Sequence, residues 1–438
     1  MNKRIKLKSL LTLTCLLPFA LSTFSQPTSD TLKLTVNQAT NLAMISNKSI
    51  QSSQLDVQKA RAKVWETTGI GLPNISLSGT YTHIFEVPTI AFGSPEPIAL
   101  GVKDNTTFDL KVTQLIFSGD YIVGLQAAKV YKAISEKNLV KQQLDTRQTV
   151  SETYYLALIV DENLKIVSQN NGLTEQTLIE LEAMLAQGFI EDTEVDQLKL
   201  TVNSLKNLEA SLIGQSKNLQ NLLKFQMGVE INQPVELTNT ITELVEASSI
   251  GSINQLDINQ NIDYQIMSNM VGAQKLILKR EKSTFLPTIA AYYNHQELWK
   301  KSDFNFQPKD LAGLTLSLPI MVGTQRLARV KQASLAYMQS KIQQAEAAQG
   351  LQLKYDTEKL NYHIAVNDYL NKKENTEISE RIFKKTTIKL KEGMASTLDL
   401  SQIQMQYLNT VSDYYSSALT LLKAKASMDR LLSLPINK

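Results

Sequence analysis

The chain has 438 residues, of which 43% are hydrophobic and 20% are charged, and this composition excludes an intrinsically disordered protein. Its formal net charge is +3, and the sequence contains no basic stretch interleaved with aromatic residues, so nucleic-acid binding is not expected. Only 11 Pro and 17 Gly interrupt the chain, which permits very long helices.

Residues 1–25 have the pattern of a secretory signal peptide. Four basic residues precede an apolar stretch at residues 10–21, and small residues lead to an expected cleavage site near Ser25. An uncleaved anchor is the alternative, although the stretch is shorter than the about 20 residues that a spanning helix needs. Cleavage would leave 41 Lys and Arg against 42 Asp and Glu, and it would remove Cys15, the only cysteine. The mature protein would then have no thiol for a disulfide, for catalysis or for zinc.

The remaining sequence shows one order of elements twice: helix, strand, loop, strand, very long helix, turn and long helix. We assign residues 26–228 to a first repeat, residues 229–260 to a connector with one short helix, and residues 261–438 to a second repeat. The periodicity of apolar residues predicts that the first repeat begins with a helix at about residues 36–68 and the second with a helix at about residues 262–283.

Four strands are expected in two pairs. They lie at about residues 74–87, 106–117, 288–299 and 310–320. A Leu-Pro dipeptide precedes each pair and a Gly follows it, so the two pairs correspond. In the first strand Ile75, Leu77 and Tyr81 alternate with hydroxyl residues, which gives one apolar and one polar face. The third strand alternates poorly.

A very long helix is expected after each pair, at about residues 121–187 and 325–392. Neither contains proline, and at about 1.5 Å per residue each would reach about 100 Å. Each ends near a glycine, and in the helix that follows, apolar residues recur at spacings of three and four, as in left-handed coiled coils. The expected rows are Val195, Leu198, Val202 and Leu205 in the first repeat and Leu400, Ile403, Tyr407 and Thr410 in the second.

Helices of this length cannot fold back as a compact cover for the apolar strand faces. Those faces therefore indicate the wall of an outer-membrane barrel. Four strands cannot close a barrel, because small barrels need about eight strands and open edges are not tolerated in lipid. Three copies of the chain would supply about twelve strands, and the same symmetry would arrange the helices as a tube.

The duplicated order, the Leu-Pro strand entries, the strand exits at Gly119 and Gly323 and the two glycines at the helix ends occur in one sequence. Together they resemble the TolC-like outer membrane efflux protein family (outer membrane factors) over nearly the whole mature chain. The resemblance implies a mostly α fold with a transmembrane β part. It implies a homotrimer with a twelve-stranded barrel in the outer membrane, four strands from each chain, and a long coiled-coil α-barrel across the periplasm.

The resemblance also implies a function. The trimer would be the channel through which a tripartite efflux pump, or a type I secretion system, passes small molecules or proteins to the exterior. Its partners would be a periplasmic adaptor (a membrane fusion protein) and, through it, an inner-membrane transporter of the RND or ABC type. The resemblance implies no cofactor.

Gly188 and Gly393 would mark the periplasmic tips, because glycine can take the positive φ that ends a helix. Ser396 or Thr397 would cap the helix after the second tip. By resemblance, the adaptor-docking set at the tips is Gly188, Phe189, Glu194, Gly393, Met394, Ala395, Ser396 and Thr397. Phe189 and Met394 would either contact the adaptor or pack within the tip, and both readings stay open.

Asp399 corresponds, by resemblance, to an acidic residue that faces the pore constriction, and Gln402 stands where some members have a second one. A ring of three Asp399 carboxylates would favour cations at the constriction. The alternative is that Asp399 only stabilises the first turn of its helix through the helix dipole.

Other chemistry finds little support in the sequence. His83, His295 and His363 show no metal-ligand spacing, and no phosphate loop, nucleophile elbow or zincin motif is present, so neither a metal site nor an enzyme is expected. The main alternative is a periplasmic coiled-coil adaptor or scaffold without membrane insertion. That alternative explains export and the coiled-coil rows, but it does not explain four amphipathic strands in two pairs.

Overall fold

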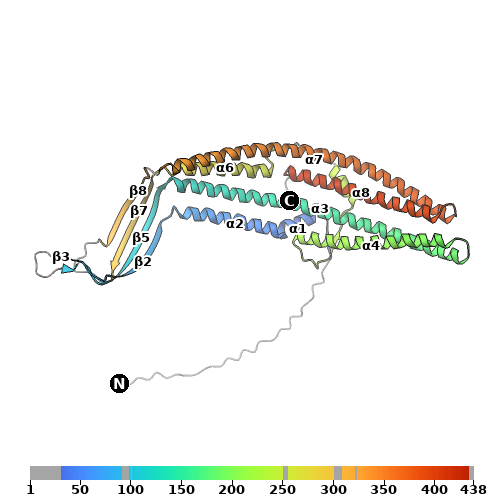
Figure 1. Cartoon of the computed structure of the whole chain (residues 1–438), viewed down its shortest axis with the longest axis horizontal. Helices are drawn as coiled ribbons and strands as arrows, with labels where there is room; N and C mark the ends of the chain where they lie inside the picture. The colour runs from blue at the N-terminus through green and yellow to red at the C-terminus, as the bar shows by residue number, and fades with distance from the viewer. Residues whose placement is uncertain are drawn as a thin grey trace, which may run out of the picture.

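A computed structural model describes residues 31–90, 98–99, 101–249, 255–299, 308–320 and 323–433. The expected signal peptide, residues 1–25, lies outside the described residues. The molecule is elongated: a sheet occupies one end, and long helices run from it to two hairpin tips at the other end (Figure 1). Within the described ranges, no helix has both the length and the apolar character needed to cross a bilayer.

The sheet has four antiparallel strands in the order β2, β5, β7, β8. They are β2 Asn74–His83, β5 Asp104–Ser118, β7 Thr288–Leu298 and β8 Asp310–Ser317. β2 and β8 end earlier than the sequence predicts, at His83 and Ser317. A two-residue ribbon, β3 Thr89–Ile90 with β4 Ile98–Ala99, forms a separate sheet. In the described part of the chain, the outer edges of β2 and β8 pair with no further strand.

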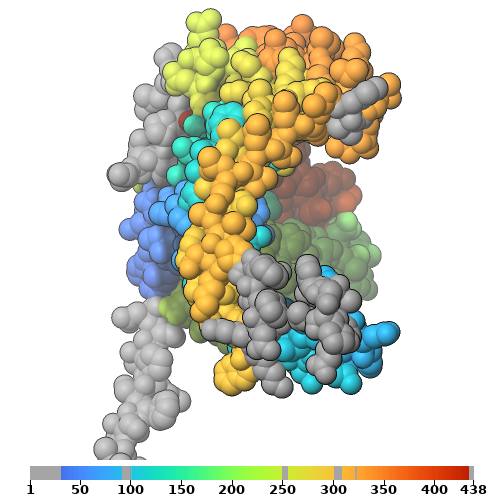
Figure 2. All heavy atoms as spheres, turned by 90° about the vertical axis from the view of Figure 1, so that its left-hand side faces the viewer, coloured from blue at the N-terminus to red at the C-terminus, as the bar shows by residue number. Residues whose placement is uncertain are grey.

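One face of this sheet is mostly apolar and is exposed. Directly paired residues share a face, and Leu77 pairs with Leu110 while Ser78 pairs with Asp109. Leu77 is 71% exposed and Leu314 is 74% exposed. Figure 2, seen from the sheet end, shows that the chain forms a curved wall with a hollow on one side. The expected alternation is therefore present, and the chain's own helices leave the apolar face uncovered.

Both strand pairs carry the same side-chain cluster, in which a Tyr hydroxyl and a His Nδ1 share one Asp oxygen. The clusters are Tyr81, His83 and Asp104 in the first repeat and Tyr293, His295 and Asp310 in the second. No local pattern predicted these clusters, because the partners lie on different strands. Among the described residues, no three His, Cys, Asp or Glu side chains gather as they would around a metal ion.

The strand order sets the lateral order of four helices, whose parallel positions we call lanes. The lanes begin with α2 Lys48–Gly69, α3 Gly119–Ala186, α6 Ile262–Ser283 and α7 Gln325–Lys391. Helices in neighbouring lanes pack on each other. α3 and α7 are 68 and 67 residues long, which confirms the expected very long helices.

Two further helices extend the lanes towards the tips: α4 Asp192–Met227 continues the lane of α2, and α8 Thr397–Leu431 continues that of α6 (Figure 1). At the first joint, Asn47 donates from Nδ2 to the Gln226 carbonyl at 2.6 Å. At the second, Asn261 donates from Nδ2 to the Leu431 carbonyl at 2.8 Å. The two outer lanes are therefore α2 with α4 on one side and α7 on the other.

The first helix was predicted wrongly as one element. The structure has α1 Val36–Ser46 and then α2, separated by Asn47. The side-chain Oδ1 of Asn47 accepts from the backbone N–H groups of Ser49 and Ile50 at 2.9 and 3.2 Å. A capped N-terminus therefore forms inside the expected helix.

The connector contains more structure than predicted. β1 Leu32–Leu34 pairs in parallel with β6 Val235–Leu237, and α5 Ile241–Ser249 follows. Tyr154 of α3, with 0% of its surface exposed, donates its hydroxyl to the Leu34 carbonyl at 2.8 Å. This bond ties the small sheet to the middle of the helical part.

The expected coiled-coil row in α4 is confirmed, since Val195, Leu198, Val202 and Leu205 are all buried. In α8 the row is wrong at the three expected positions that follow Leu400, namely Ile403, Tyr407 and Thr410. The buried residues there are Gln404, Leu408 and Val411, whereas Ile403, Tyr407 and Thr410 are only partly buried. The reason is that α8 packs on α3 as well as on α7. Its most buried row therefore turns towards the groove between those two helices.

Candidate functional site at the hairpin tips

The first tip joins α3 to α4 through Gly188. Its φ of 76° lies in the left-handed region that favours glycine. The Phe189 N–H donates to the Met184 carbonyl at 3.0 Å and the Gly188 N–H to the Leu185 carbonyl at 2.9 Å, which is the bonding of a Schellman turn. Glu191 precedes α4 and makes no side-chain cap bond.

The second tip joins α7 to α8 by the same turn. Gly393 has a φ of 68°, and the Met394 N–H donates to the Lys389 carbonyl at 2.8 Å. α8 then starts with a capping box, in which Ser396 Oγ accepts from the Asp399 N–H at 3.1 Å and Asp399 Oδ2 accepts from the Ser396 N–H at 3.0 Å. The expected positive φ at both glycines is confirmed, and Ser396 rather than Thr397 is the cap.

The two tips are joined by polar contacts. The Thr397 N–H donates to Glu194 Oε2 at 3.0 Å, and the Thr397 hydroxyl donates to the same oxygen. Lys391 forms an ion pair with Glu180 at 3.3 Å, and the hydroxyls of Thr201 and Ser401 lie 3.0 Å apart. Thr397 is 2% exposed, so Glu194 holds a buried group at the start of α8.

The large apolar side chains at the turns point outwards. Phe189 is 71% exposed and Met394 is 69% exposed. Ile190, by contrast, packs on the buried cluster of Leu181, Val195 and Leu198. Within this chain Phe189 and Met394 therefore do not pack inside the tips, which leaves them free for a contact with another molecule.

Asp399 and Gln402 lie on α8 near the second tip, and both are exposed. The hydrogen bonds that Asp399 accepts from the backbone N–H and the hydroxyl of Ser396 lower the pKa of its carboxyl group. Asp399 therefore completes the capping box at the first turn of α8, and this position is compatible with both readings of the residue. Gln402 lines a shallow groove with Leu398, Met405 and, from α4, Gln197.

The structure brings most of the predicted tip residues to one end of the molecule. It adds Glu180, Lys391, Thr201 and Ser401, which the sequence did not indicate. These partners are about 200 residues apart, at separations of 211 and 200 residues, so no local pattern could have paired them.

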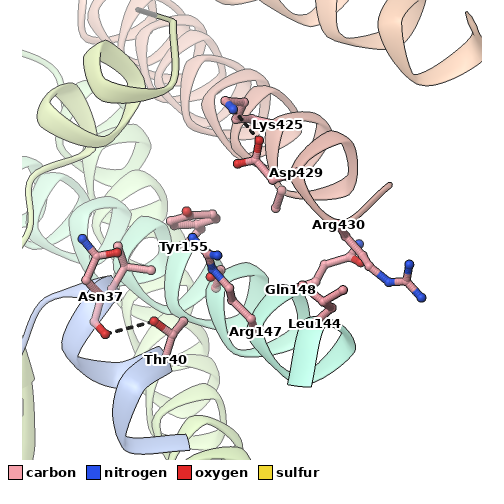
Figure 3. A pocket seen from close by; sticks show the side chains of 12 residues that line it. Asn37, Thr40, Leu144, Arg147, Gln148, Tyr155, Lys425, Asp429 and Arg430 are labelled. Atoms are coloured by element: carbon pink, nitrogen blue, oxygen red, sulfur yellow. Dashed lines mark hydrogen bonds and ion pairs between the residues drawn. The ribbon is translucent and has the colours of Figure 1, made fainter. Parts of the chain in front are cut away.

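A separate small cavity lies between α1, α3 and α8, away from the tips (Figure 3). Its volume is about 80 Å³. Lys425 and Asp429 form an ion pair at its wall at 2.5 Å, and burial raises the pKa of the Tyr155 hydroxyl to about 12. Drug-sized ligands occupy pockets of about 300–1,000 Å³, so this cavity is too small for such a ligand.

Solved structures share this architecture. The outer membrane protein VceC from Vibrio cholerae is 15% identical, with 92% of this chain and 97% of that chain covered and a TM-score of 0.74. CusC, described for conformational changes that accompany folding and transmembrane channel formation, is 14% identical over 91% of each chain, with a TM-score of 0.76. The CmeC outer membrane channel of Campylobacter jejuni is 14% identical over 91% of this chain and 85% of that chain, with a TM-score of 0.75.

The sequence itself matches no family model and no curated protein. At 14–15% identity, the agreement over nine-tenths of the chain concerns the fold.

Proposed function

From the TolC-like outer membrane channel fold that this chain has, we propose that it is the outer-membrane exit duct of a tripartite efflux pump or a type I secretion system. The duct passes small molecules, or proteins, from a periplasmic adaptor and an inner-membrane transporter to the exterior. It acts without enzymatic chemistry of its own.

The observation that carries the proposal is the exposed apolar face of the four-stranded sheet. Ile75, Leu77, Leu314 and Leu316 are each between 66% and 74% exposed in the single chain. Covering such side chains with lipid is favourable by about 25 cal/mol for each Å² of apolar surface removed from water. The opposite face carries hydroxyl and charged residues, which suits a water-filled lumen.

Closure of the sheet requires further copies of the chain. In the part of the chain that the structure describes, β2 and β8 leave backbone groups unpaired at the two sheet edges, and such groups are costly in hydrocarbon. In the helical part next to the sheet, the outer lanes carry exposed apolar residues: Leu55 and Trp65 on α2, and Leu335, Met338 and Ile342 on α7. In a homotrimer β8 of one subunit would pair with β2 of the next, and the twelve strands would form one barrel.

The hairpin tips would be the docking end of the duct. Phe189 and Met394 offer apolar side chains to the adaptor, and the turns at Gly188 and Gly393 hold them at the surface. The contact of Glu194 with Thr397 fixes how the second turn meets the first, and Ala395 and Ser396 belong to the same end. In the trimer, Asp399 and Gln402 would lie at the pore constriction, where ionised Asp399 favours cations.

Extraction of cell envelopes tests the proposal against the adaptor alternative. We expect the protein to stay in the outer-membrane fraction after washing with salt or carbonate and to dissolve only in detergent. Release by the wash would favour a peripheral adaptor and contradict the proposal.

A deletion strain tests the transport role. Loss of the protein should increase sensitivity to some members of a panel of antibiotics, dyes and bile salts, or should stop secretion of a protein. Unchanged sensitivity and unchanged secretion would contradict the proposed role.

A further inference from the structure

The part of α7 near its hairpin tip has a basic face that the rest of this chain leaves uncovered. α7 contacts α8 through Lys372, Thr376, Ser379 and Phe383, at spacings of three and four residues. The opposite side of the helix carries Ile378, Arg381, Ile382, Lys385 and Lys389. Lys385 and Lys389 are exposed, and among the described residues their ammonium groups have no hydrogen bond or ion pair.

The part of α4 near its hairpin tip, in the other outer lane, has an acidic face. α4 contacts α3 through Val195 and Leu198 and contacts α8 through Thr201. Asp192, Asp196 and Leu200 lie on the remaining side, and Leu200 is 69% exposed. Asp192 has no ion pair in the part of the chain that the structure describes, and Asp196 has only Lys199 at 3.9 Å.

The basic residues of α7 and the acidic residues of α4 also lie at equal distances from their tips along the helix axes. Lys389 stands four residues before Gly393, and Asp192 stands four residues after Gly188. Lys385 stands eight residues before Gly393, and Asp196 stands eight residues after Gly188. Since both helices rise by about 1.5 Å per residue, each lysine lies at the level of one aspartate.

We infer that α7 of one subunit docks on α4 of the next through this charge ladder, with Lys389 facing Asp192 and Lys385 facing Asp196. The inference rests on the proposed trimer, in which the two outer lanes meet, and it assigns the chemistry of that contact near the tips. The occupant of the basic face is a second copy of this chain. Further from the tips, the same pair of lanes meets through exposed apolar residues, including Leu360 on α7 and Phe225 on α4.

The ladder explains why the tips differ in composition. Between residues 175 and 198 the chain has seven acidic residues and no basic one, whereas residues 381–391 have five basic residues and no acidic one. A trimer would have six hairpins in a ring, and the acidic and basic segments near their tips would alternate around it. Every boundary between subunits would therefore bring opposite charges together. Pairs of this kind at an exposed surface weaken as the salt concentration rises.

Cross-linking of the detergent-solubilised full chain tests the contact. Lys385→Cys and Asp196→Cys are placed in one chain, and a short bismaleimide should link neighbouring subunits into dimers and trimers on a denaturing gel. The matched control replaces Lys385→Cys by Lys384→Cys, because Lys384 pairs with Glu380 and borders the groove towards α3 of its own chain. The control should give little cross-linking between subunits, and equal yields would overturn the inference.

Charge reversal of the second pair tests the electrostatics in the same cross-linking variant. Lys389→Asp should lower the cross-linking rate at low salt, by up to about fivefold for one exposed pair. Adding Asp192→Lys should restore the rate, and high salt should remove the difference. A double reversal that fails to recover would overturn the ladder.

The native mass of the cysteine variants separates this inference from the proposed function. A trimer that does not cross-link at these positions would overturn only the ladder. A monomer would overturn both.

Discussion

The sheet and the hairpins differ in how far the single chain buries their apolar side chains. In the first hairpin, Leu198 of α4 is 0% exposed and packs on α3 of the same chain. In the sheet, Leu314 is 74% exposed, and the described helices of this chain do not cover it. The hairpins therefore complete their cores within one chain, whereas the sheet depends on surroundings outside it. Those surroundings, under our proposal, are lipid and two further subunits.

The largest expected effect comes from the core of the hairpin. Leu198→Ala should lower the free energy of local unfolding by about 2–5 kcal/mol, because it removes buried methyl groups and leaves a cavity. Hydrogen exchange of the α4 amides measures this. Ile179→Ala, at a site 67% exposed on α3, is the control and should change exchange little. Similar exchange in the two variants would contradict a core that is complete within one chain.

A slightly smaller effect is expected in the sheet, and it should appear only in a membrane. Leu314→Arg should reduce barrel assembly, because an arginine on the lipid face costs about 2–4 kcal/mol near the bilayer midplane. The amount of trimer in outer-membrane fractions measures it. Thr315→Arg, one residue on and on the opposite face, should assemble normally. Tolerance of arginine at both positions would argue against a lipid-facing surface.

The tip turns should respond to backbone strain without loss of the trimer. Gly393→Val places a β-branched residue at a φ of 68°, which costs about 1–3 kcal/mol. We expect drug sensitivity close to that of the deletion strain, with the trimer intact by native gel. Gly350→Val, in the interior of α7 where a Cβ meets open space, should keep activity. Loss of the trimer in Gly393→Val would count against a docking role for this tip.

The smallest effect concerns a charge network that joins α8 to α3 and α6. Arg430 binds Asp145 at 2.5 Å and Asp263 at 2.8 Å, and Lys141 binds Asp263 at 2.7 Å. Burial opposes ionisation of Asp263, but the hydrogen bonds from Arg430 and Lys141 outweigh it and lower the pKa of its carboxyl group.

A lowered pKa in the folded state means that ionised Asp263 stabilises the protein. This contribution is present above about pH 4, the range of an unperturbed carboxyl group, and is lost as the pH falls through the lowered pKa. Thermal unfolding between pH 7 and pH 3 should therefore show a smaller acid destabilisation in Asp263→Asn than in the wild type. Identical pH profiles would mean that the network contributes nothing to stability.

Sequence reasoning found the features that repeat locally. The very long helices follow from the absence of proline, the strand faces from alternation at Ile75 and Leu77, and the tip turns from Gly188 and Gly393. It failed where a single side chain ends a helix within an otherwise continuous helical pattern. Asn47 ends α1 by capping α2, although its neighbours read as one continuous helix.

Contacts between distant segments also escaped prediction. Glu194 and Thr397 are 203 residues apart, and the second row in α8 is shifted because Gln404 binds Thr174 of α3. Periodicity reports that a face is buried, but it does not report which of two neighbours covers it. The docking and pore roles of the tip residues therefore remain proposals that the local turn geometry supports.

The mass of the protein purified in mild detergent tests the central claim most directly. Native mass spectrometry should give a complex of three chains, since one four-stranded sheet leaves two unpaired edges. A stable monomer that remains in solution without detergent would contradict the account.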